Sequence, residues 1–415
     1  MPIQWRAESA TLRATSIDQL NAFLHRVRGH VDAIHAAPAA ERPPIHVFLG
    51  NEAADADSIV SSLVYAYLRD QRPQSEPVIA VPVLSIPRDE LPLRCDVMAL
   101  FEALGIDASA MVFVDEFPWH RQQQLASMRL TLLDHNALTT KRMLAACDSL
   151  GECVVEILDH HADLGAHPGA AVRDIAFQGH EALVASTCTL VAERLLASER
   201  IPHEHHALSA TLLLAVIALD SINFDPRAKK VTPRDVAAAA ELERVAFADK
   251  AALFEWLHGE KFNVAHWSAF SLRNCLQCDY KEFDASSGLR YGVSAVLIPL
   301  QAFVGKCATP QALTTALRDW CKINGLAFLV VMTMTVAPSD GSRHREILFF
   351  EDSETPRFVP HCLRALAEDD VLQLQPLTLP VETTADTCFH AFAQRNTAAS
   401  RKQVVPLLQH ALSKL

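Results

Sequence analysis

The sequence predicts an α/β protein: a parallel-sheet N-terminal domain followed by a smaller α+β domain. Short apolar runs near residues 45–49, 111–114, 130–133 and 153–158 alternate with segments of helical periodicity. A Pro- and charge-rich stretch begins near residue 225, and strand-like runs dominate beyond residue 279. A chain of 415 residues is also too long for one ordinary core. We therefore expect domains at 1–255 and 256–415.

Periodicity places the elements in order along the chain. In the first domain we expect helices at 16–37, 58–69, 97–104, 181–198 and 207–220, between strands at 45–49, 77–84 and the three later apolar runs. A short helix near 235–246 and a connector around 258–267 follow. In the second domain we expect strands at 280–284, 291–300, 326–337 and 345–352, and helices at 309–323 and 402–412.

Composition excludes several classes of protein. The net charge of −12, from 49 acidic and 37 basic residues, argues against a broad nucleic-acid-binding face. No apolar run is long enough to span a bilayer, and the first twenty residues do not form a signal peptide. Ten scattered cysteines favour reduced, buried thiols. We expect a cytoplasmic monomer without membrane partners, with a vacuole as the alternative compartment.

Two acids occupy the turn after the first strand. In GNEAADADS, Asp55 and Asp57 follow Gly50, and helical periodicity begins after Ser58. One acid can cap the amide groups of a first helical turn. Capping explains the second acid less well, so the turn is a candidate cation site.

Further polar residues directly follow other apolar segments. Asp134 ends LTLLD, the pair His160 and His161 ends EILDHH, and Asp220 ends a helix, where an acid is disfavoured. Each alone is compatible with a hydrogen-bonded surface residue. In a parallel α/β sheet, however, working groups gather at the carboxyl ends of the strands. We therefore expect these residues at one sheet edge.

The set supplies four carboxylates and an imidazole, without thiolate. These oxygen and nitrogen donors suit two divalent cations such as Mg²⁺, Mn²⁺ or Co²⁺ better than a structural zinc. Two such cations bridged by one carboxylate can activate a water molecule for in-line attack on phosphorus.

These motifs resemble those of the DHH phosphoesterase superfamily, in the branch with the second type of C-terminal domain (DHHA2). That branch contains manganese-dependent family II pyrophosphatases, prune proteins and eukaryotic exopolyphosphatases. The motifs that carry the resemblance, in the family's order, are GNEAADADS, LLDHN, ILDHH, VASTCTLV, ALDSINF, DYKEFD and SRKQVVP. The resemblance implies an active site in an interdomain cleft.

The resemblance also implies roles for single residues. Asp55 and Asp134 would bind the first metal. Asn51 would join them as a ligand, at the position where the pyrophosphatases have a histidine. Asp134 would bridge to the second metal, whose other implied ligands are Asp57, His160 and Asp220. His161 would contact the substrate phosphate and assist proton transfer, which makes Asp134 and His161 the catalytic pair. Because Asn51 replaces an imidazole, Mg²⁺ is the expected metal, with Mn²⁺ or Co²⁺ as alternatives.

Basic residues of the second domain complete the implied site. Lys281, Arg401 and Lys402 match groups that clamp phosphate in the family, and His167 in DHHADLGAH matches the exopolyphosphatase form. As surface cations, Arg401 and Lys402 should contribute little to folding. Ala185 replaces a glycine common before Thr187, which alters the close backbone approach expected there.

The leading functional hypothesis is a metal-dependent exopolyphosphatase that removes terminal phosphate from linear polyphosphate. An inorganic pyrophosphatase is the first alternative, against which Asn51 and the DHHADLGAH segment argue. A prune-like nucleotide phosphodiesterase that also acts as an interaction scaffold is the second alternative, and the retained His161 and Lys402 argue for real catalysis. The third alternative is a binding protein without activity, against which the implied metal ligands argue, since Asn51 is the only replacement among them.

Overall fold

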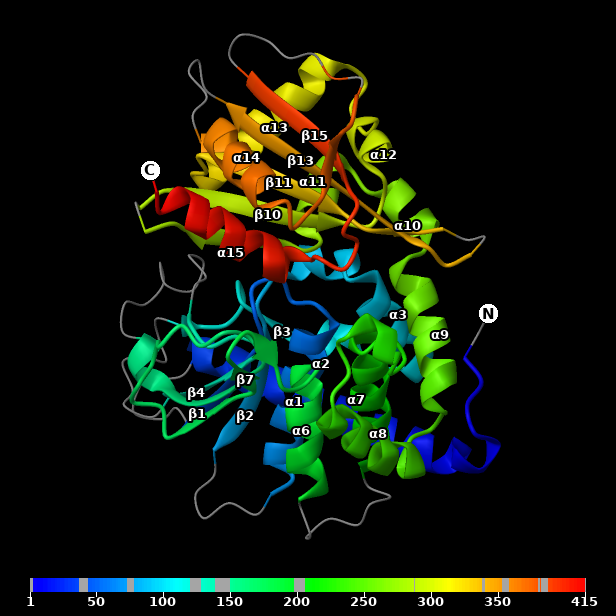
Figure 1. The fold of residues 1–415 in the computed structure, drawn as a ribbon. Coiled ribbons are helices and arrows are strands. Elements are labelled where there is room, and N and C mark those ends of the chain that lie inside the picture. The colour runs from blue at the N-terminus through cyan, green and yellow to red at the C-terminus, as the bar shows by residue number, and fades with distance from the viewer. Residues whose placement is uncertain are drawn as a thin grey trace. The chain divides into compact units, whose positions relative to one another are not determined.

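The computed structural model describes residues 3–36, 44–72, 78–119, 128–138, 150–197, 206–286, 288–337, 340–352, 358–379, 381 and 387–414. The chain forms two compact units, Met1–Lys261 and Phe262–Leu415 (Figure 1). The division comes later than residue 255, because helix α9 (Lys250–Lys261) continues to the end of the first unit. The segment expected to be a connector is thus largely helical.

Unit 1 contains a six-stranded parallel sheet in the order β3-β2-β1-β4-β5-β6. This confirms the parallel α/β prediction for the first domain. Its strands are β1 (Ile45–Leu49), β2 (Ile79–Leu84), β3 (Val112–Phe113), β4 (Met128–Leu133), β5 (Val154–Asp159) and β6 (Val172–Ile175), with a small hairpin of β7 (Phe177–Gln178) and β8 (Glu181–Ala182). Strands β1 and β4 are neighbours in the middle of the sheet, so the segments that follow them emerge side by side.

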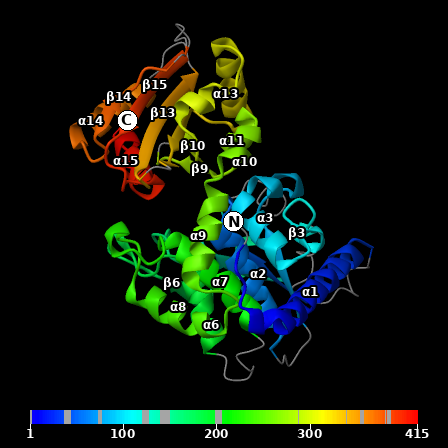
Figure 2. The same ribbon diagram turned by 90° about the vertical axis from the view of Figure 1, so that its right-hand side faces the viewer.

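The helices of unit 1 are α1 (Ala10–Ala36), α2 (Ala56–Asp70), α3 (Cys95–Leu104), α6 (Thr187–Leu196), α7 (Ala207–Asp220), α8 (Pro233–Val245) and α9. Helix α7 is apolar on nearly all sides and packs against α2, α6, α8 and α9, as a central helix must. Figure 2 shows α6, α7 and α8 side by side in green. Each helix is thereby fixed relative to several others.

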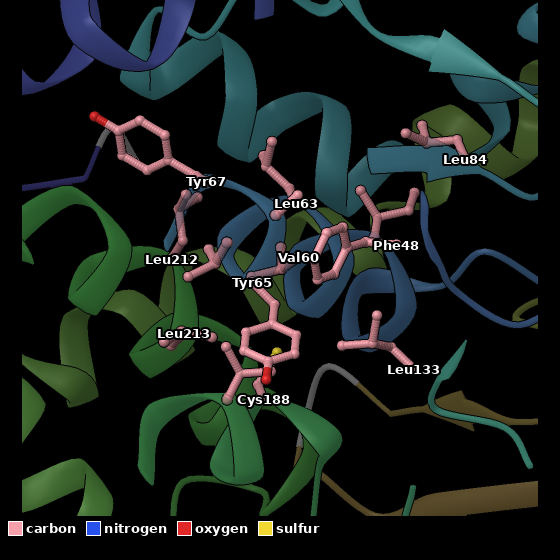
Figure 3. Packing of buried hydrophobic residues seen from close by; sticks show 14 of the residues in the cluster. Phe48, Val60, Leu63, Tyr65, Tyr67, Leu84, Leu133, Cys188, Leu212 and Leu213 are labelled. Carbon is pink, nitrogen blue, oxygen red and sulfur yellow. The ribbon is translucent and has the colours of Figure 1, made fainter. Parts of the chain in front are cut away.

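The core of unit 1 joins the sheet to this helical layer. Figure 3 shows Phe48 of β1 and Leu133 of β4 close to Val60 and Tyr65 of α2, with Cys188 of α6 nearby. The Phe48 and Tyr65 rings meet edge to face, with centroids 5.4 Å apart. Because this packing includes residues next to both strand ends, it fixes the start of α2 relative to the sheet edge.

Unit 2 contains a mixed sheet in the order β14-β15-β13-β11-β10-β9, and among its described strands only β10 and β11 pair in parallel. Its elements are α10 (Val264–Ala269), α11 (Leu272–Gln277), β9 (Tyr280–Asp284), β10 (Arg290–Val296), α12 (Leu300–Val304), α13 (Pro310–Asn324), β11 (Phe328–Thr333), β12 (Thr335–Val336), β13 (Arg343–Asp352), α14 (Phe358–Asp369), β14 (Leu374–Pro376), β15 (Thr387–Gln394) and α15 (Arg401–Leu412). This confirms the α+β expectation, although α14, β14 and β15 were not anticipated. None of the described helices is long and apolar enough to cross a bilayer.

One predicted helix begins later than its periodicity suggests. The segment 181–198 was expected to be one helix, but α6 starts at Thr187 after the β7–β8 hairpin. Ser186 is the N-cap, and its side chain accepts a hydrogen bond from the Cys188 amide. This start brings the first amides of α6 to the sheet edge.

Gly50 is required by a close backbone approach between β1 and α2. A Cβ atom at Gly50 would lie 2.8 Å from both the Cβ and the carbonyl oxygen of Ser58. The turn can therefore fold back onto α2 only if residue 50 has no side chain.

We predict that Gly50→Ala destabilises unit 1 by roughly 1–3 kcal/mol, as expected when an atom is forced into a packed region. The matched control is Gly29→Ala in α1, where nothing lies within 4 Å of the added Cβ. There we expect a gain of about 0.5–1 kcal/mol, because alanine is the better helix former. Urea unfolding of both variants measures the difference, and equal effects would contradict the close-approach argument.

Candidate metal centre and active site

The carboxyl ends of three neighbouring strands and two helix ends deliver the candidate residues. Asn51 follows β1, Asp134 follows β4, and His160 and His161 follow β5. Asp57 lies in the first turn of α2, and Asp220 is the last residue of α7. Direct contacts connect Asn51, Asp57, Asp134, His160 and His161, although more than a hundred residues separate the first from the last.

Asp134 lies at the centre of the group. Its Oδ2 accepts hydrogen bonds from Asn51 Nδ2 at 2.6 Å and Ser58 Oγ at 2.8 Å. Its Oδ1 lies 3.4 Å from His160 Nε2 and 3.6 Å from His161 Nδ1. The residue has φ +64°, a left-handed conformation that aspartate tolerates better than most side chains. The carboxylate is thus held on one oxygen, while the other faces two imidazole rings.

Asn51 is held by hydrogen bonds at both ends of its amide. Its Oδ1 accepts from the Ala53 amide at 2.9 Å while Nδ2 donates to Asp134. In this conformation Asn51 orients Asp134, and its role as a metal ligand stays a prediction. Ser58 contributes to the same arrangement, since its hydroxyl also accepts a hydrogen bond from the backbone N–H of Asn51 at 3.0 Å. Ser58 was not among the residues singled out from the sequence.

The two acids of the Asp-x-Asp turn cap two different helices. Asp55 is the N-cap of α2 and accepts from the Ser58 amide at 3.1 Å. Asp57 accepts from the α6 N-terminus: Ser186 Oγ at 2.5 Å, Thr187 N at 2.8 Å and Cys188 N at 2.9 Å. Helix capping therefore accounts for both acids of the turn, which the sequence analysis did not expect. Capping does not explain why Asp55 and Asp57 lie beside further acids.

Buried acids crowd one another here. Burial raises the pKa of Asp57 well above its usual range, and the neighbouring Asp134 and Asp220 carboxylates raise it further. Burial likewise raises the pKa of Asp220, although Lys261 and Lys230 oppose the shift. Asp220 Oδ2 is buried without a hydrogen-bond partner among the described residues. A buried carboxylate oxygen that receives no hydrogen bond and lies beside other acids is suited to bind a cation.

The donor set fits divalent cations. Among the described residues, Asp134, His160 and His161 form a group whose ligand atoms all lie within 4.8 Å of one another. Asp57 Oδ2 lies 3.8 Å from His160 Nε2, so the second predicted ligand set is partly assembled around this imidazole. Carboxylate and imidazole donors without thiolate agree with Mg²⁺ or Mn²⁺ chemistry. Which of these residues bind metal stays a prediction.

The two histidines of the DHH motif are oriented differently. His160 Nδ1 lies 3.1 Å from the Val184 carbonyl, which directs Nε2 toward Asp57 and Asp134. His161 Nδ1 lies 2.8 Å from Asp159 Oδ1. Burial lowers the pKa of His161 to about 4 although Asp159 opposes this, so the ring is neutral at pH 7. A neutral ring that donates from Nδ1 to Asp159 leaves Nε2 as an acceptor.

Asp159 and Asn136 join the loops that carry these histidines. Asp159 is fully buried and also accepts from the His160 and His161 amides. Burial alone would raise the pKa of Asp159, but the hydrogen bond from His161 lowers it. Asn136 donates to Asp159 Oδ2 at 2.5 Å and to the Ala162 carbonyl at 3.0 Å. The sequence analysis did not single out Asp159 or Asn136, although Asp159 begins the DHH motif and Asn136 ends the DHN motif.

His167 lies apart from this network in the described structure. Its Nε2 accepts from the Leu138 amide at 3.2 Å, and its φ is +53°. Burial lowers its pKa, while a backbone hydrogen bond with Gly151 opposes the shift. The ring therefore joins the segments around Leu138 and Gly151, and it would have to leave these contacts to reach a substrate. Its predicted role in substrate binding stays a prediction.

The three basic residues belong to unit 2. Lys281 lies on β9, and Arg401 and Lys402 begin α15 after the Ser400 N-cap. Arg401 is largely buried and donates to the Asp279 carbonyl at 3.0 Å and to Asp279 Oδ1 at 2.6 Å. Arg401 is therefore not the solvated surface cation that the sequence analysis assumed, because its guanidinium joins α15 to the segment before β9. Its contribution to folding stays a prediction. Phosphate contacts by all three stay predictions.

The chain shows two family matches that coincide with the two units. The model of the DHH family, N-terminal domain, matches residues 45–218, and the model of the DHHA2 domain matches residues 261–411. The chain is 33% identical over 387 residues to a Homo sapiens protein named exopolyphosphatase PRUNE1, covering 91% of this chain and 78% of that one. It is 26% identical over 426 residues to a candidate exopolyphosphatase of Schizosaccharomyces pombe, covering 96% and 99%.

A solved structure supports the same fold. The crystal structure of a candidate family II inorganic pyrophosphatase from Methanococcus jannaschii superposes with a TM-score of 0.57 at 19% identity, covering 89% of this chain and 99% of that one. This likeness concerns the fold alone. Together with the matched models and the human relative, it confirms the resemblance drawn from the motifs: the chain belongs to the DHH phosphoesterase family, in the branch whose DHH domain is followed by a DHHA2 domain.

Proposed function

We propose that this protein is a metal-dependent exopolyphosphatase that releases terminal phosphate from linear inorganic polyphosphate. The observation that carries the hydrolytic part is the crowding of buried carboxylates and imidazoles around Asp134. The choice of substrate is supported by the names of two relatives that align with almost the whole chain. The general reaction is hydrolysis of a phosphoanhydride bond.

The residues of unit 1 would divide between two cations. Asp55 and Asp134 would hold one, and the second would be held by Asp134 with Asp57, His160 and Asp220. When bound, the cations would activate the attacking water and neutralise charge on the reacting phosphate. Asn51 and Ser58 would keep Asp134 in place, since both donate to its Oδ2. Asn51 favours Mg²⁺, with Mn²⁺ and Co²⁺ as alternatives.

His161 is the residue best placed to exchange a proton with substrate or water. It is the more exposed of the two motif histidines, with 30% of its side chain accessible against 6% for His160. Its neutral ring donates from Nδ1 to Asp159, so Nε2 can accept a proton. Asp159 would then stabilise the charged ring and hold its orientation.

Pyrophosphate hydrolysis is the competing activity within the same chemistry. The fold neighbour from Methanococcus jannaschii carries that name, but the likeness extends only to the fold. Asn51 occupies the position where the pyrophosphatases have histidine, and this difference favours the exopolyphosphatase hypothesis. A nucleotide phosphodiesterase activity stays the second alternative, and the same assay separates the three activities.

The test is phosphate release from polyphosphates of graded length, from pyrophosphate and from cyclic nucleotide, each with Mg²⁺ or Mn²⁺. We expect polyphosphate to be the best substrate, and excess chelator to abolish turnover. Asp134→Asn should lower kcat by at least about a hundred-fold, because the central carboxylate is lost. The control Asp89→Asn, at an exposed acid, should leave turnover unchanged.

Two results would contradict the proposal. Full turnover in excess chelator would remove the metals from the reaction. Preference for pyrophosphate or cyclic nucleotide over every polyphosphate would replace the proposed substrate while retaining the metal centre.

The basic residues of unit 2 offer a separate prediction. Lys402 is exposed, so Lys402→Ala should leave the melting temperature unchanged and lower kcat/KM by roughly ten- to a thousand-fold through loss of a charge-assisted phosphate contact. Arg401→Ala should also destabilise unit 2 by about 0.5–1.5 kcal/mol, because the bonds to Asp279 are lost. Lys414→Ala, near the end of the chain, is the exposed control. Normal kinetics of Lys402→Ala would exclude Lys402 from substrate binding.

A further inference from the structure

One turn contacts two of the predicted ligands of the second metal. The Val184 carbonyl lies 3.1 Å from His160 Nδ1. Ser186, Thr187 and Cys188 donate to Asp57 through one hydroxyl and two backbone amides. The 184–189 turn, which joins the β7–β8 hairpin to α6, therefore sets the orientation of both side chains. A displacement of this turn would move the imidazole and the carboxylate together.

Asp235 anchors the middle of the 184–189 turn. Its Oδ1 and Oδ2 accept from the Ala185 amide at 3.0 and 3.1 Å, and Oδ1 accepts from Thr189 Oγ1 at 2.7 Å. Oδ2 also accepts from the amide and hydroxyl of Thr232, both at 2.8 Å, in the capping box of α8. The carboxylate is fully buried, so these donors supply its stabilisation.

The bonds from Asp235 hold the turn between its two contacts with the predicted ligands. The Ala185 amide lies between Val184, which contacts His160, and Ser186, which contacts Asp57. Thr189 holds the next part of α6 to the same carboxylate. Asp235 thus acts on both predicted ligands through their immediate supports. An ordinary capping aspartate would need only its bonds to Thr232.

We infer that Asp235 is a positioning residue for the second metal, acting through the 184–189 turn on His160 and Asp57. This inference rests on the proposed metal-dependent function. Residues that hold metal ligands in orientation typically alter metal affinity or activity by about ten- to a hundred-fold when they are changed. Asp235→Asn keeps the shape but turns one acceptor into a donor, which would face the amide of Ala185 or the donors of Thr232.

The experiment measures Mn²⁺ binding by calorimetry on the full chain, with no substrate present. We expect Asp235→Asn to weaken one of two Mn²⁺ sites by about ten- to a hundred-fold, while the other changes little. Thr189→Val removes one hydroxyl donor to Asp235 and should give a smaller loss at the same site. It serves as the second variant if Asp235→Asn does not fold.

Two control variants separate positioning from stability. Thr232→Ala weakens the cap of α8 but leaves the bonds to Ala185 and Thr189. Arg234→Gln breaks a paired contact to Glu193 that also joins α8 to α6. Both should lower the melting temperature with Mn²⁺ affinity unchanged. Equal Mn²⁺ losses in controls and Asp235→Asn, or no loss in Asp235→Asn, would overturn the inference.

Failure of the Asp235 inference can be distinguished from failure of the proposed function. If the wild-type chain binds two Mn²⁺ ions but does not cleave polyphosphate, the substrate proposal fails and the Mn²⁺ titrations still decide the role of Asp235. If the wild-type chain binds neither Mn²⁺ nor Mg²⁺, both proposals are overturned.

Discussion

Repulsion among buried carboxylates is the constraint on which the rest of this site depends. Asp57, Asp134 and Asp220 are brought within electrostatic reach of one another and of His160. Asp57 and Asp134 are buried, while Asp220 is half-buried with a buried Oδ2. Such a group costs free energy unless it is protonated, hydrogen-bonded or neutralised by cations. Hydrogen bonds serve Asp57 and one oxygen of Asp134, but Asp220 Oδ2 has no such partner among the described residues. Divalent cations would provide the remaining stabilisation.

The surrounding fold can be understood as a means of holding these acids in place. Gly50 lets the turn after β1 approach α2, so that Ser58 reaches both Asn51 and Asp134. The N-terminus of α6 provides fixed donors for Asp57, whose second role as a ligand would use its remaining lone pairs. The left-handed conformation at Asp134 is a small local strain of the kind found at functional sites.

The sequence predicted the parallel sheet of unit 1 and the acids at its strand ends, because short apolar runs and the residues after them are local signals. It did not predict that Asp57 caps α6, since that contact joins segments 130 positions apart. Asp235 was overlooked for the same reason: its sequence signal is a helix cap, and its contacts with Ala185 and Thr189 arise only in the folded chain. The partner of Arg401 was equally invisible, because Asp279 precedes a strand far earlier in the chain.

The most direct measurement of the central claim is the location of Mn²⁺ in crystals of the wild-type protein, from its anomalous scattering. We expect two anomalous peaks beside Asp134, one near Asp55 and the other near Asp57, His160 and Asp220. No peak at Asp134, with ions bound elsewhere or not at all, would contradict it.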